Sequence, residues 1–158
     1  MTVRVLFGAL VIALLAMGPV SACNQPAEAA ALRQGLTDWI NQMRRDGGLG
    51  ALRDNAALQT AASGHACDMA KRNFFAHEGP GGPAFGSRIK RTGYRFKRAS
   101  ENIAKTSAAA VSSVATVWRD SSLHWANIMD SNVRDLGIGI AQGNGRTYWV
   151  MNVGRPKG

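Results

Sequence analysis

The 158-residue sequence contains only two cysteines, Cys23 and Cys67. Two cysteines exclude the dense disulfide framework on which small secreted scaffolds depend, so an apolar core must stabilise the fold. Acidic residues are also scarce, ten against nineteen basic ones, which gives a formal net charge of +9. Because the sequence has neither low-complexity segments nor internal repeats, we expect a single globular domain after the N-terminal segment.

The excess positive charge is concentrated between residues 88 and 98. The block consists of Arg88, Lys90, Arg91, Arg95, Lys97 and Arg98. Such a block favours anionic partners, for example lipid headgroups or cell-wall polymers, although solvated basic faces are common on soluble proteins. The pattern does not predict a patch of stacking aromatic side chains, so nucleic acid is not expected as a partner.

Residues 1–22 are predicted to form a signal peptide. Arg4 supplies the positive charge at its start, residues 5–17 are apolar and uncharged, and small residues precede Cys23. The apolar run is too short for a membrane-spanning helix, which needs about 20 residues. The prediction is therefore an exported protein, either anchored as a lipoprotein that faces the periplasm or the cell surface, or secreted.

Val20-Ser21-Ala22-Cys23 resembles a bacterial lipobox, so we expect Cys23 to be acylated and residues 23–31 to form a short linker to the membrane. Two alternatives remain, namely cleavage before Cys23 without lipidation and cleavage after residues 27–29. With Cys23 acylated, Cys67 is expected to be an unpaired buried thiol. Without acylation, a Cys23–Cys67 disulfide becomes possible in an oxidising compartment.

Hydrophobic periodicity predicts several helices and one hairpin. An amphipathic helix includes Leu32 to Met43, and a second helix begins at an N-cap provided by Asp54 or Asn55 and ends near Arg72. A short helix from Phe85 to Gly93 and a longer one over residues 108–120 follow. Strands over 136–141 and 147–153 flank a Gly-Asn-Gly turn. Helices that flank a small antiparallel sheet are the expected architecture.

Three residues outside the helix stripes have side chains suited to metal binding or proton transfer: His77, Glu101 and His124. Their spacing matches no local metal motif, because His77-Glu78 lacks the second histidine of the helical zinc-protease signature. His65 lies on the apolar face of the second helix, so we expect a hydrogen-bonded core histidine there.

The order of short motifs along the chain is more specific than any one of them. The motifs are Asn41-Gln42-Met43-Arg44, Gly48-Leu49-Gly50-Ala51-Leu52, His65-Ala66, Phe74-Phe75-Ala76-His77, Gly93-Tyr94, Glu101-Asn102-Ile103-Ala104, Trp118, His124 with Asn127-Ile128-Met129, Gly137-Ile138-Gly139-Ile140-Ala141 and Tyr148-Trp149-Val150. In this order they resemble the CAP superfamily, which includes cysteine-rich secretory proteins, antigen five and pathogenesis-related proteins. The compact Ser-x-x-His-x-x-Asn-Ile segment is similar to the short bacterial branch, and the domain is predicted over residues 32–158.

The resemblance implies an α+β fold, a three-layer α-β-α sandwich with a small central antiparallel sheet and a cavity. The family's cavity carries two histidines and two glutamates, and the histidines can hold a divalent ion such as zinc. By motif, His77 and His124 are the histidines and Glu101 is the first glutamate. Ser121 stands where the second glutamate is expected, with Asp120 beside it as a substitute, so the tetrad is incomplete.

Two imidazoles and one carboxylate match a zinc site with an open position for water, which makes His77, His124 and Glu101 the predicted metal ligands. Glu101 and His124 are also the candidate catalytic residues. Alternatively, Glu101 orients one imidazole and leaves a weak site with two protein ligands. Asn102 and Asn127 are expected to hydrogen-bond the loop backbone around the pocket. Trp125, next to His124, is expected to line it.

These features favour a non-enzymatic binding protein for a lipid, a sterol-like molecule or another cell-envelope component, with a pocket for a divalent metal. The alternative is a metal-dependent hydrolase that acts on peptide or cell-wall bonds. A third hypothesis is a purely structural or interaction module in which the pocket has no role. The incomplete tetrad favours binding over catalysis.

Overall fold

The computed structural model describes residues 23–158, so the signal peptide predicted over residues 1–22 lies outside the described residues. This part of the chain forms five helices and four strands. The elements are α1 (Ala29–Asp46), β1 (Arg53–Asp54), α2 (Ala56–Arg72), α3 (Phe85–Arg91), β2 (Phe96–Thr106), α4 (Val111–Arg119), α5 (Ser122–Ile128), β3 (Asp135–Gly143) and β4 (Arg146–Pro156). None of the helices within residues 23–158 has the length and apolar character needed to cross a bilayer.

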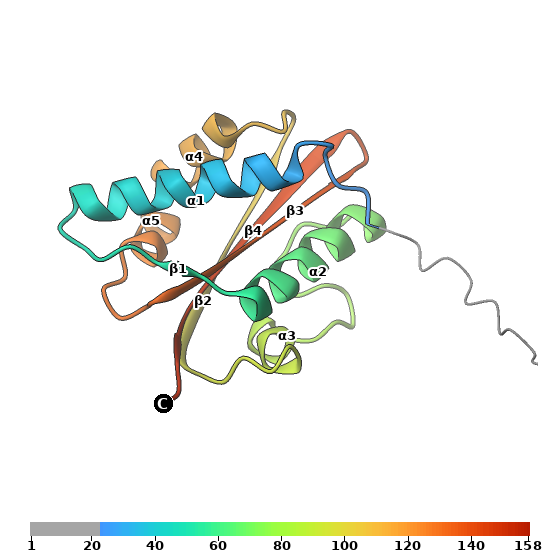
Figure 1. The fold of residues 1–158 in the computed structure, drawn as a ribbon. Helices are drawn as coiled ribbons and strands as arrows, with labels where there is room; N and C mark the ends of the chain where they lie inside the picture. The colour runs from blue at the N-terminus through green and yellow to red at the C-terminus, as the bar shows by residue number, and fades with distance from the viewer. Residues whose placement is uncertain (1–22) are drawn as a thin grey trace, which may run out of the picture.

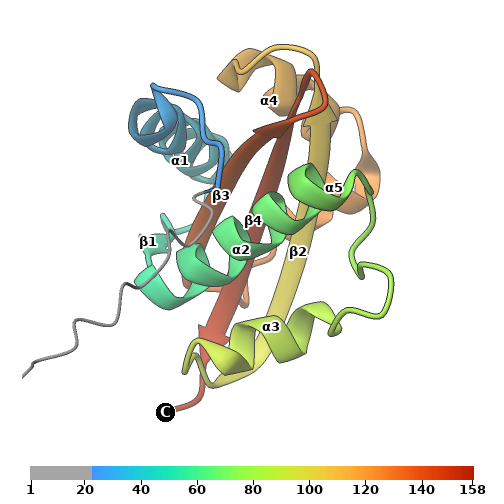
Figure 2. The same cartoon turned by 90° about the vertical axis from the view of Figure 1, so that its right-hand side faces the viewer.

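The strands form one sheet in the order β1-β3-β4-β2. Helices α1, α4 and α5 cover one face of the sheet, and α2 and α3 cover the other (Figures 1 and 2). This confirms the predicted three-layer α+β sandwich. The sheet differs from the expected one at its edge, because the two-residue β1 runs parallel to β3 while all other pairs are antiparallel.

The two faces of the sheet pack in different ways. Large side chains, among them Trp118 and Trp149, fill the space beneath α1 and α4. Beneath α2 the sheet carries glycine instead. A Cβ atom at Gly137 or Gly139 would overlap the backbone of α2, so α2 lies directly on the backbone of β3.

Two local predictions are confirmed. Asn55 caps α2, where its side-chain oxygen accepts hydrogen bonds from the N–H groups of Ala57 and Leu58 at 3.0 and 3.1 Å. Asn144 and Gly145 have φ angles of 53° and 68°, as a tight hairpin between β3 and β4 requires. Sequence periodicity missed β2 and α5. The first half of β2 is polar on both sides, so it lacks the alternation that marks a strand.

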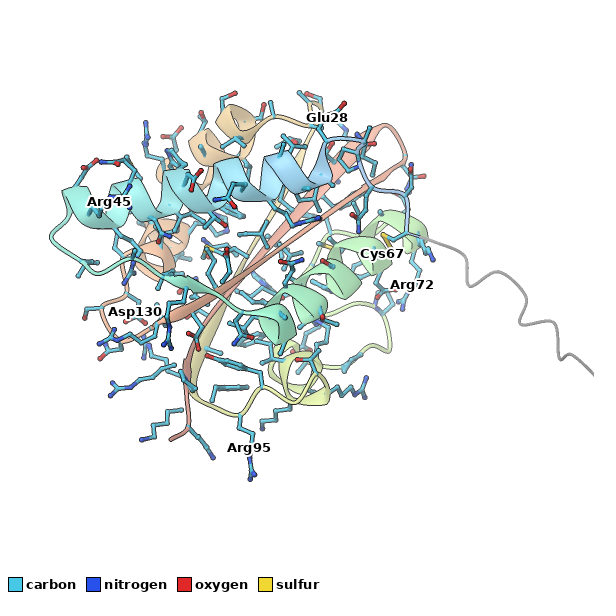
Figure 3. The ribbon with its side chains drawn as sticks, viewed as in Figure 1. Glu28, Arg45, Cys67, Arg72, Arg95 and Asp130 are labelled. Carbon is cyan, nitrogen blue, oxygen red and sulfur yellow. A yellow bond between two sulfur atoms is a disulfide. The ribbon has the colours of Figure 1, made fainter. Side chains whose placement is uncertain are left out.

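The prediction that Cys67 is an unpaired thiol is wrong, because its sulfur is bonded to that of Cys23, with 5.6 Å between the two Cα atoms (Figure 3). Acylation of Cys23 would need the same sulfur atom, so this disulfide and the lipid anchor predicted at Cys23 exclude each other, and the disulfide is the bond expected of the unlipidated alternative. The segment after Cys23 is also not a free linker. Asn24 accepts a backbone hydrogen bond from Gln142 at 2.7 Å, Pro26 is buried, and α1 already begins at Ala29.

Candidate functional site

Glu101 is the centre of a polar cluster on the α2 and α3 side of the sheet. It lies in the middle of β2, and its side chain is only 2% exposed. Arg88 donates hydrogen bonds from one guanidinium nitrogen to both carboxylate oxygens, at 2.9 and 2.8 Å. The Nδ1 atom of His77 lies 3.0 Å from Oε1 of the same carboxylate. We call Arg88, His77, Glu101 and His124 the histidine site.

Arg88 is the functional residue that sequence reasoning missed. It belongs to the basic block, but the other five members are exposed whereas the Arg88 side chain is 12% exposed. Its second guanidinium nitrogen donates to the carbonyl groups of His77 and Pro83, at 2.8 and 2.9 Å. Arg88 therefore joins α3, the loop between α2 and α3, and β2, and no feature of the sequence distinguishes it from its basic neighbours.

Asn152 of β4 completes the surroundings of Glu101. With its amide oriented so that both atoms are satisfied, Asn152 donates to Oε2 of Glu101 at 3.2 Å and accepts from the N–H of Ala62 at 3.2 Å. A carboxylate offers about four acceptor positions. Arg88, His77 and Asn152 use all of them, so Glu101 has little capacity left to bind a metal ion or to accept a proton from a substrate.

The contact with Glu101 fixes the tautomer of His77. A carboxylate can only accept, so Nδ1 of His77 carries the proton and donates to it. In the neutral ring Nε2 is then the nitrogen with a free lone pair. The His77 side chain is 52% exposed, so solvent or a ligand can reach it. Glu101 thus orients the His77 imidazole so that its Nε2 atom can contact solvent or a ligand.

His124 comes from the opposite side of the site, from α5. Ser121 caps this helix by accepting a hydrogen bond from the N–H of His124 at 3.4 Å. Burial lowers the pKa of His124 below the usual value, the positive charge of His77 lowers it further, and the carbonyl of Val117 acts in the opposite direction. The Nδ1 atom of His124 is buried and has no hydrogen-bond partner. His124 is therefore a neutral imidazole, close enough to His77 to sense its charge.

Asn102 hydrogen-bonds the backbone at His124, whereas Asn127 binds the side chain of Asn102 and not the backbone expected from the sequence. Asn127 donates to the side-chain oxygen of Asn102 at 2.8 Å, and Asn102 donates to the carbonyl of His124 at 2.9 Å. Asn102 is fully buried in β2 beside Glu101. This chain of hydrogen bonds keeps α5 in a fixed position relative to the strand that carries Glu101.

The remaining predicted residues lie at the edge of the site or outside it. Ser121 caps α5, and Asp120 is exposed where α4 ends. Trp125 packs against the core beneath α1, with its ring 6.5 Å from that of Trp39, so it contributes to packing there. His65 is a core histidine whose Nε2 donates to the carbonyl of Ala76 at 3.0 Å, as expected, and burial lowers its pKa.

A metal set of three protein ligands is not present among residues 23–158. His77 and His124 do suit a divalent ion: both can offer a neutral imidazole, and the buried Nδ1 of His124 has no partner within the protein. Glu101 fits the role of the carboxylate that orients His77. With Glu101 bound to His77, the two imidazoles are the side chains left to hold such an ion, and metal binding by them stays a prediction.

Exposed apolar side chains adjoin the same histidines along the chain. Residues 23–158 expose three large hydrophobic side chains: Phe75 at 44%, Val117 at 40% and Leu123 at 79%. Phe75 lies two residues before His77, Leu123 directly precedes His124, and the carbonyl of Val117 acts on the His124 ring. The amine of Lys105 lies 5.3 Å from the centre of the Phe75 ring. Single exposed hydrophobic residues are ordinary, and these three are notable because each adjoins a histidine of the site in the sequence or through its backbone.

The sequence matches the cysteine-rich secretory protein family, CAP, over residues 37–153. It is 29% identical to the protein YkwD of Bacillus subtilis over 122 residues, which are 75% of this chain and 46% of YkwD. An extracellular protein with an SCP domain from Bacillus anthracis has a similar structure, with a TM-score of 0.71 and 25% identity over 80% of this chain and 41% of that chain. An outer surface protein of Borrelia burgdorferi has a TM-score of 0.77 and 17% identity, covering 86% of this chain and 100% of that chain. This chain thus spans about half the length of the Bacillus proteins.

Proposed function

Because this chain belongs to the cysteine-rich secretory protein family, CAP, we propose that it is an exported, non-enzymatic binding protein that takes a lipid-like cell-envelope ligand at the histidine site. The observation that carries the proposal is that Phe75, Val117 and Leu123, the exposed large hydrophobic side chains of the described chain, adjoin His77 and His124 in the sequence or through a backbone contact. Together they offer an apolar surface at the edge of a polar site. A molecule with an apolar part and a polar head fits such a surface.

The polar half of the ligand is suggested by the charges at the site. Glu101 is neutralised by Arg88, whereas Lys105 lies on the exposed ring of Phe75. The two imidazoles can donate a hydrogen bond or bind a divalent ion. An acidic or metal-bridged headgroup is therefore the best match, and a long-chain fatty acid is the simplest probe.

Export is part of the same proposal. The signal peptide predicted over residues 1–22, the Cys23–Cys67 disulfide and the extracellular Bacillus anthracis relative all support it. Since the sulfur of Cys23 is used by the disulfide, we propose that the chain is released by signal-peptide cleavage and carries no lipid anchor.

Hydrolysis is less well supported than binding. A metal-dependent hydrolase needs a carboxylate free to accept a proton from water. Glu101 is committed to Arg88, His77 and Asn152, and Ser121 at the position of the second glutamate caps α5. The geometry thus provides two imidazoles that can bind, and a carboxylate, Glu101, whose acceptor positions are already used.

The lipid proposal is tested by measuring the transfer of a fluorescent long-chain fatty acid to the exported protein. F75S/L123S removes two exposed apolar side chains, whose burial against a ligand contributes about 2 kcal/mol, so binding should weaken about 30-fold. L49S, in the loop after α1, is the control and should bind as the wild type does. Equal binding by F75S/L123S and the wild type would refute the proposal.

Metal binding is tested separately, by calorimetric titration with zinc. H77A/H124A should lose at least about tenfold in affinity, and E101Q, which weakens the orientation of His77, should lose less than H77A/H124A. E78Q, one residue from His77, is the control. Unchanged zinc affinity in H77A/H124A would remove the metal from the proposal and leave the lipid surface to be judged by its own experiment.

A further inference from the structure

The end of the sheet opposite the hairpin carries an unusual concentration of exposed basic side chains. We call it the basic pole, and it consists of Arg53, Arg95, Lys97, Arg98, Arg134, Arg155 and Lys157, all of them exposed. Figure 3 shows such side chains extending from this end, around the labelled Arg95 and Asp130. Only three members, Arg95, Lys97 and Arg98, belong to the basic block of the sequence. The fold adds the other four from distant segments.

Backbone hydrogen bonds hold these segments together. Arg98 of β2 is paired with Arg155 of β4, and the N–H of Lys157 donates to the carbonyl of Arg95 at 2.9 Å. On the other side of β4, the N–H of Arg53 donates to the carbonyl of Arg134 at 2.9 Å. Because the sheet fixes the spacing of their backbones, the basic side chains need little rearrangement to meet a partner.

Acidic side chains do not neutralise the pole. Asp54, Asp130 and Asp135 lie among the seven basic residues, which leaves four positive charges. Arg4 is the only charged residue of 1–22, so residues 23–158 carry +8 and the pole provides half of this charge. The excess lies in one region, where like charges repel one another unless an anionic partner is present.

Three of the basic residues, Arg53, Arg95 and Lys157, line a shallow, open hollow. It has a volume of about 600 Å³, and its lining includes Arg53, Tyr94, Arg95, Asp135 and Lys157. Asp135 is buried and accepts from Arg53 at 2.8 Å and from the Tyr94 hydroxyl at 2.8 Å. These bonds hold the Arg53 guanidinium at the wall of the hollow while its side chain stays 73% exposed.

We propose that the basic pole binds a linear polyanion with repeating phosphate groups, of the phosphate-polyol type found in cell envelopes. Five of its seven cations are arginines, whose planar guanidinium groups bind phosphate through two parallel hydrogen bonds. The pole extends over three strands and the loop before β3, which is wider than a single phosphate. A chain of phosphates can contact several of these arginines at once.

The pole is less suited to a bilayer or to nucleic acid. The large hydrophobic side chains that the described residues expose lie beside the histidines, so none is available at the pole for insertion into a membrane. Tyr94 is buried, and Phe96 is half-buried beneath the amine of Lys90 at 5.8 Å. Neither ring is free to stack on a base.

The test measures binding of the exported protein to poly(glycerol phosphate) at several salt concentrations. R95Q/K97Q/K157Q removes three exposed charges of the pole and should weaken binding about tenfold, with a shallower dependence on salt. The control R33Q/R45Q/R146Q removes three charges from α1 and the hairpin, those of the exposed Arg45 and Arg146 and of the half-buried Arg33, and should retain most of the affinity. Both variants have the same net charge, so a difference between them reports on the location of the charges.

Several outcomes would overturn the inference. They are an equal loss in the two triple variants, no binding of the wild type at moderate salt, or tighter binding to phosphatidylglycerol vesicles or double-stranded DNA than to poly(glycerol phosphate). R95Q/K97Q/K157Q should still bind the fatty acid, because it leaves Phe75 and Leu123 unchanged. The fatty-acid experiment can therefore fail without affecting this inference, and this inference can fail without affecting the lipid proposal.

Discussion

The histidine site and the basic pole both hold a buried carboxylate against an arginine, but the arginines differ in exposure. At the histidine site Arg88 is 12% exposed, and its nitrogens bond Glu101 and two backbone carbonyls. At the pole Arg53 is 73% exposed while its partner Asp135 is 6% exposed. An arginine paired with a buried carboxylate therefore has a different role in each region. At the histidine site the charge of Arg88 is neutralised inside the protein, whereas at the pole the guanidinium of Arg53 remains accessible to a partner.

The largest loss of stability is expected at the histidine site, where the ion pair is buried. E101A leaves the Arg88 guanidinium buried without its carboxylate, which should lower the free energy of unfolding by about 4 kcal/mol. Denaturant titration measures this change. R53Q at the pole is the matched comparison and should cost less, about 1–2 kcal/mol, because the buried Asp135 loses the hydrogen bonds from Arg53 but keeps the one from the Tyr94 hydroxyl.

The double variant R88M/E101L separates the ion pair from the packing around it. Replacing both members by apolar side chains of similar size removes the unpaired charge, so this variant should be more stable than E101A. If R88M/E101L is no more stable than E101A, the loss arises from the other contacts of Glu101, and the contrast in burial between the two arginines does not explain it.

The disulfide belongs to neither region and provides the second prediction. The Cys23–Cys67 bond closes a separation of 44 residues, so C23S/C67S should lower the free energy of unfolding by about 3 kcal/mol. The ion pairs of both regions should remain intact. Thiol labelling of the exported wild-type protein under native, non-reducing conditions checks the bond itself. Labelled Cys67 together with a lipid-modified Cys23 would contradict the structure.

The disulfide also shows where sequence reasoning reached its limit. The segment before Cys23 resembles a lipobox, and a local pattern cannot reveal that Cys67, 44 residues away, lies within bonding distance. Arg88 was missed for a related reason: its neighbours in the chain are exposed cations, and only the fold brings it to Glu101. The basic pole was likewise only half visible, because Arg53, Arg134, Arg155 and Lys157 come from distant segments.

What the sequence did predict depended on local chemistry or on the order of motifs. The Asn55 cap and the Asn144-Gly145 turn follow from backbone requirements within a few residues. The resemblance to CAP proteins singled out His77, Glu101 and His124; in the structure His77 lies 3.0 Å from Glu101, and the charge of His77 lowers the pKa of His124. It did not predict how the carboxylate is used, because that depends on Arg88 and Asn152 and on the hydrogen bonds that they donate.

The third prediction concerns the hydrogen bond from Tyr94 that holds Asp135 in place at the pole. Y94F removes the hydroxyl that donates to Asp135, and it should lower the free energy of unfolding by about 1–2 kcal/mol since a buried acceptor loses a partner. Burial and the hydrogen bond to Asp135 both raise the pKa of Tyr94, so the hydroxyl donates at every pH of interest. Denaturant titration measures the loss. A loss as large as that of E101A would show that the two regions do not differ in stability as proposed.

The smallest expected effects are the responses of the two regions to pH and to salt. The pKa of His124 in the folded protein is lowered, so below the usual histidine value of about 6.5 the unfolded chain binds more protons and stability falls as the pH falls. His65, also with a lowered pKa, acts in the same direction, so H124N should reduce this dependence without abolishing it. Denaturant titrations from about pH 7.5 to about pH 5.5 measure the change, and an unaltered slope in H124N would contradict it.

The pole should respond to salt and not to this change in pH, because it contains no histidine. Burial favours protonation of Asp130, but hydrogen bonds from Asn132 and Arg98 hold the pKa of that carboxyl below its usual value, so it stays ionised. Affinity for poly(glycerol phosphate) should therefore be the same at about pH 7.5 and about pH 5.5, and it should fall as added salt screens the exposed arginines. Affinity that changes with pH but not with salt would mean that the polymer binds at the histidine site, where the charges of the protein are buried or titrate.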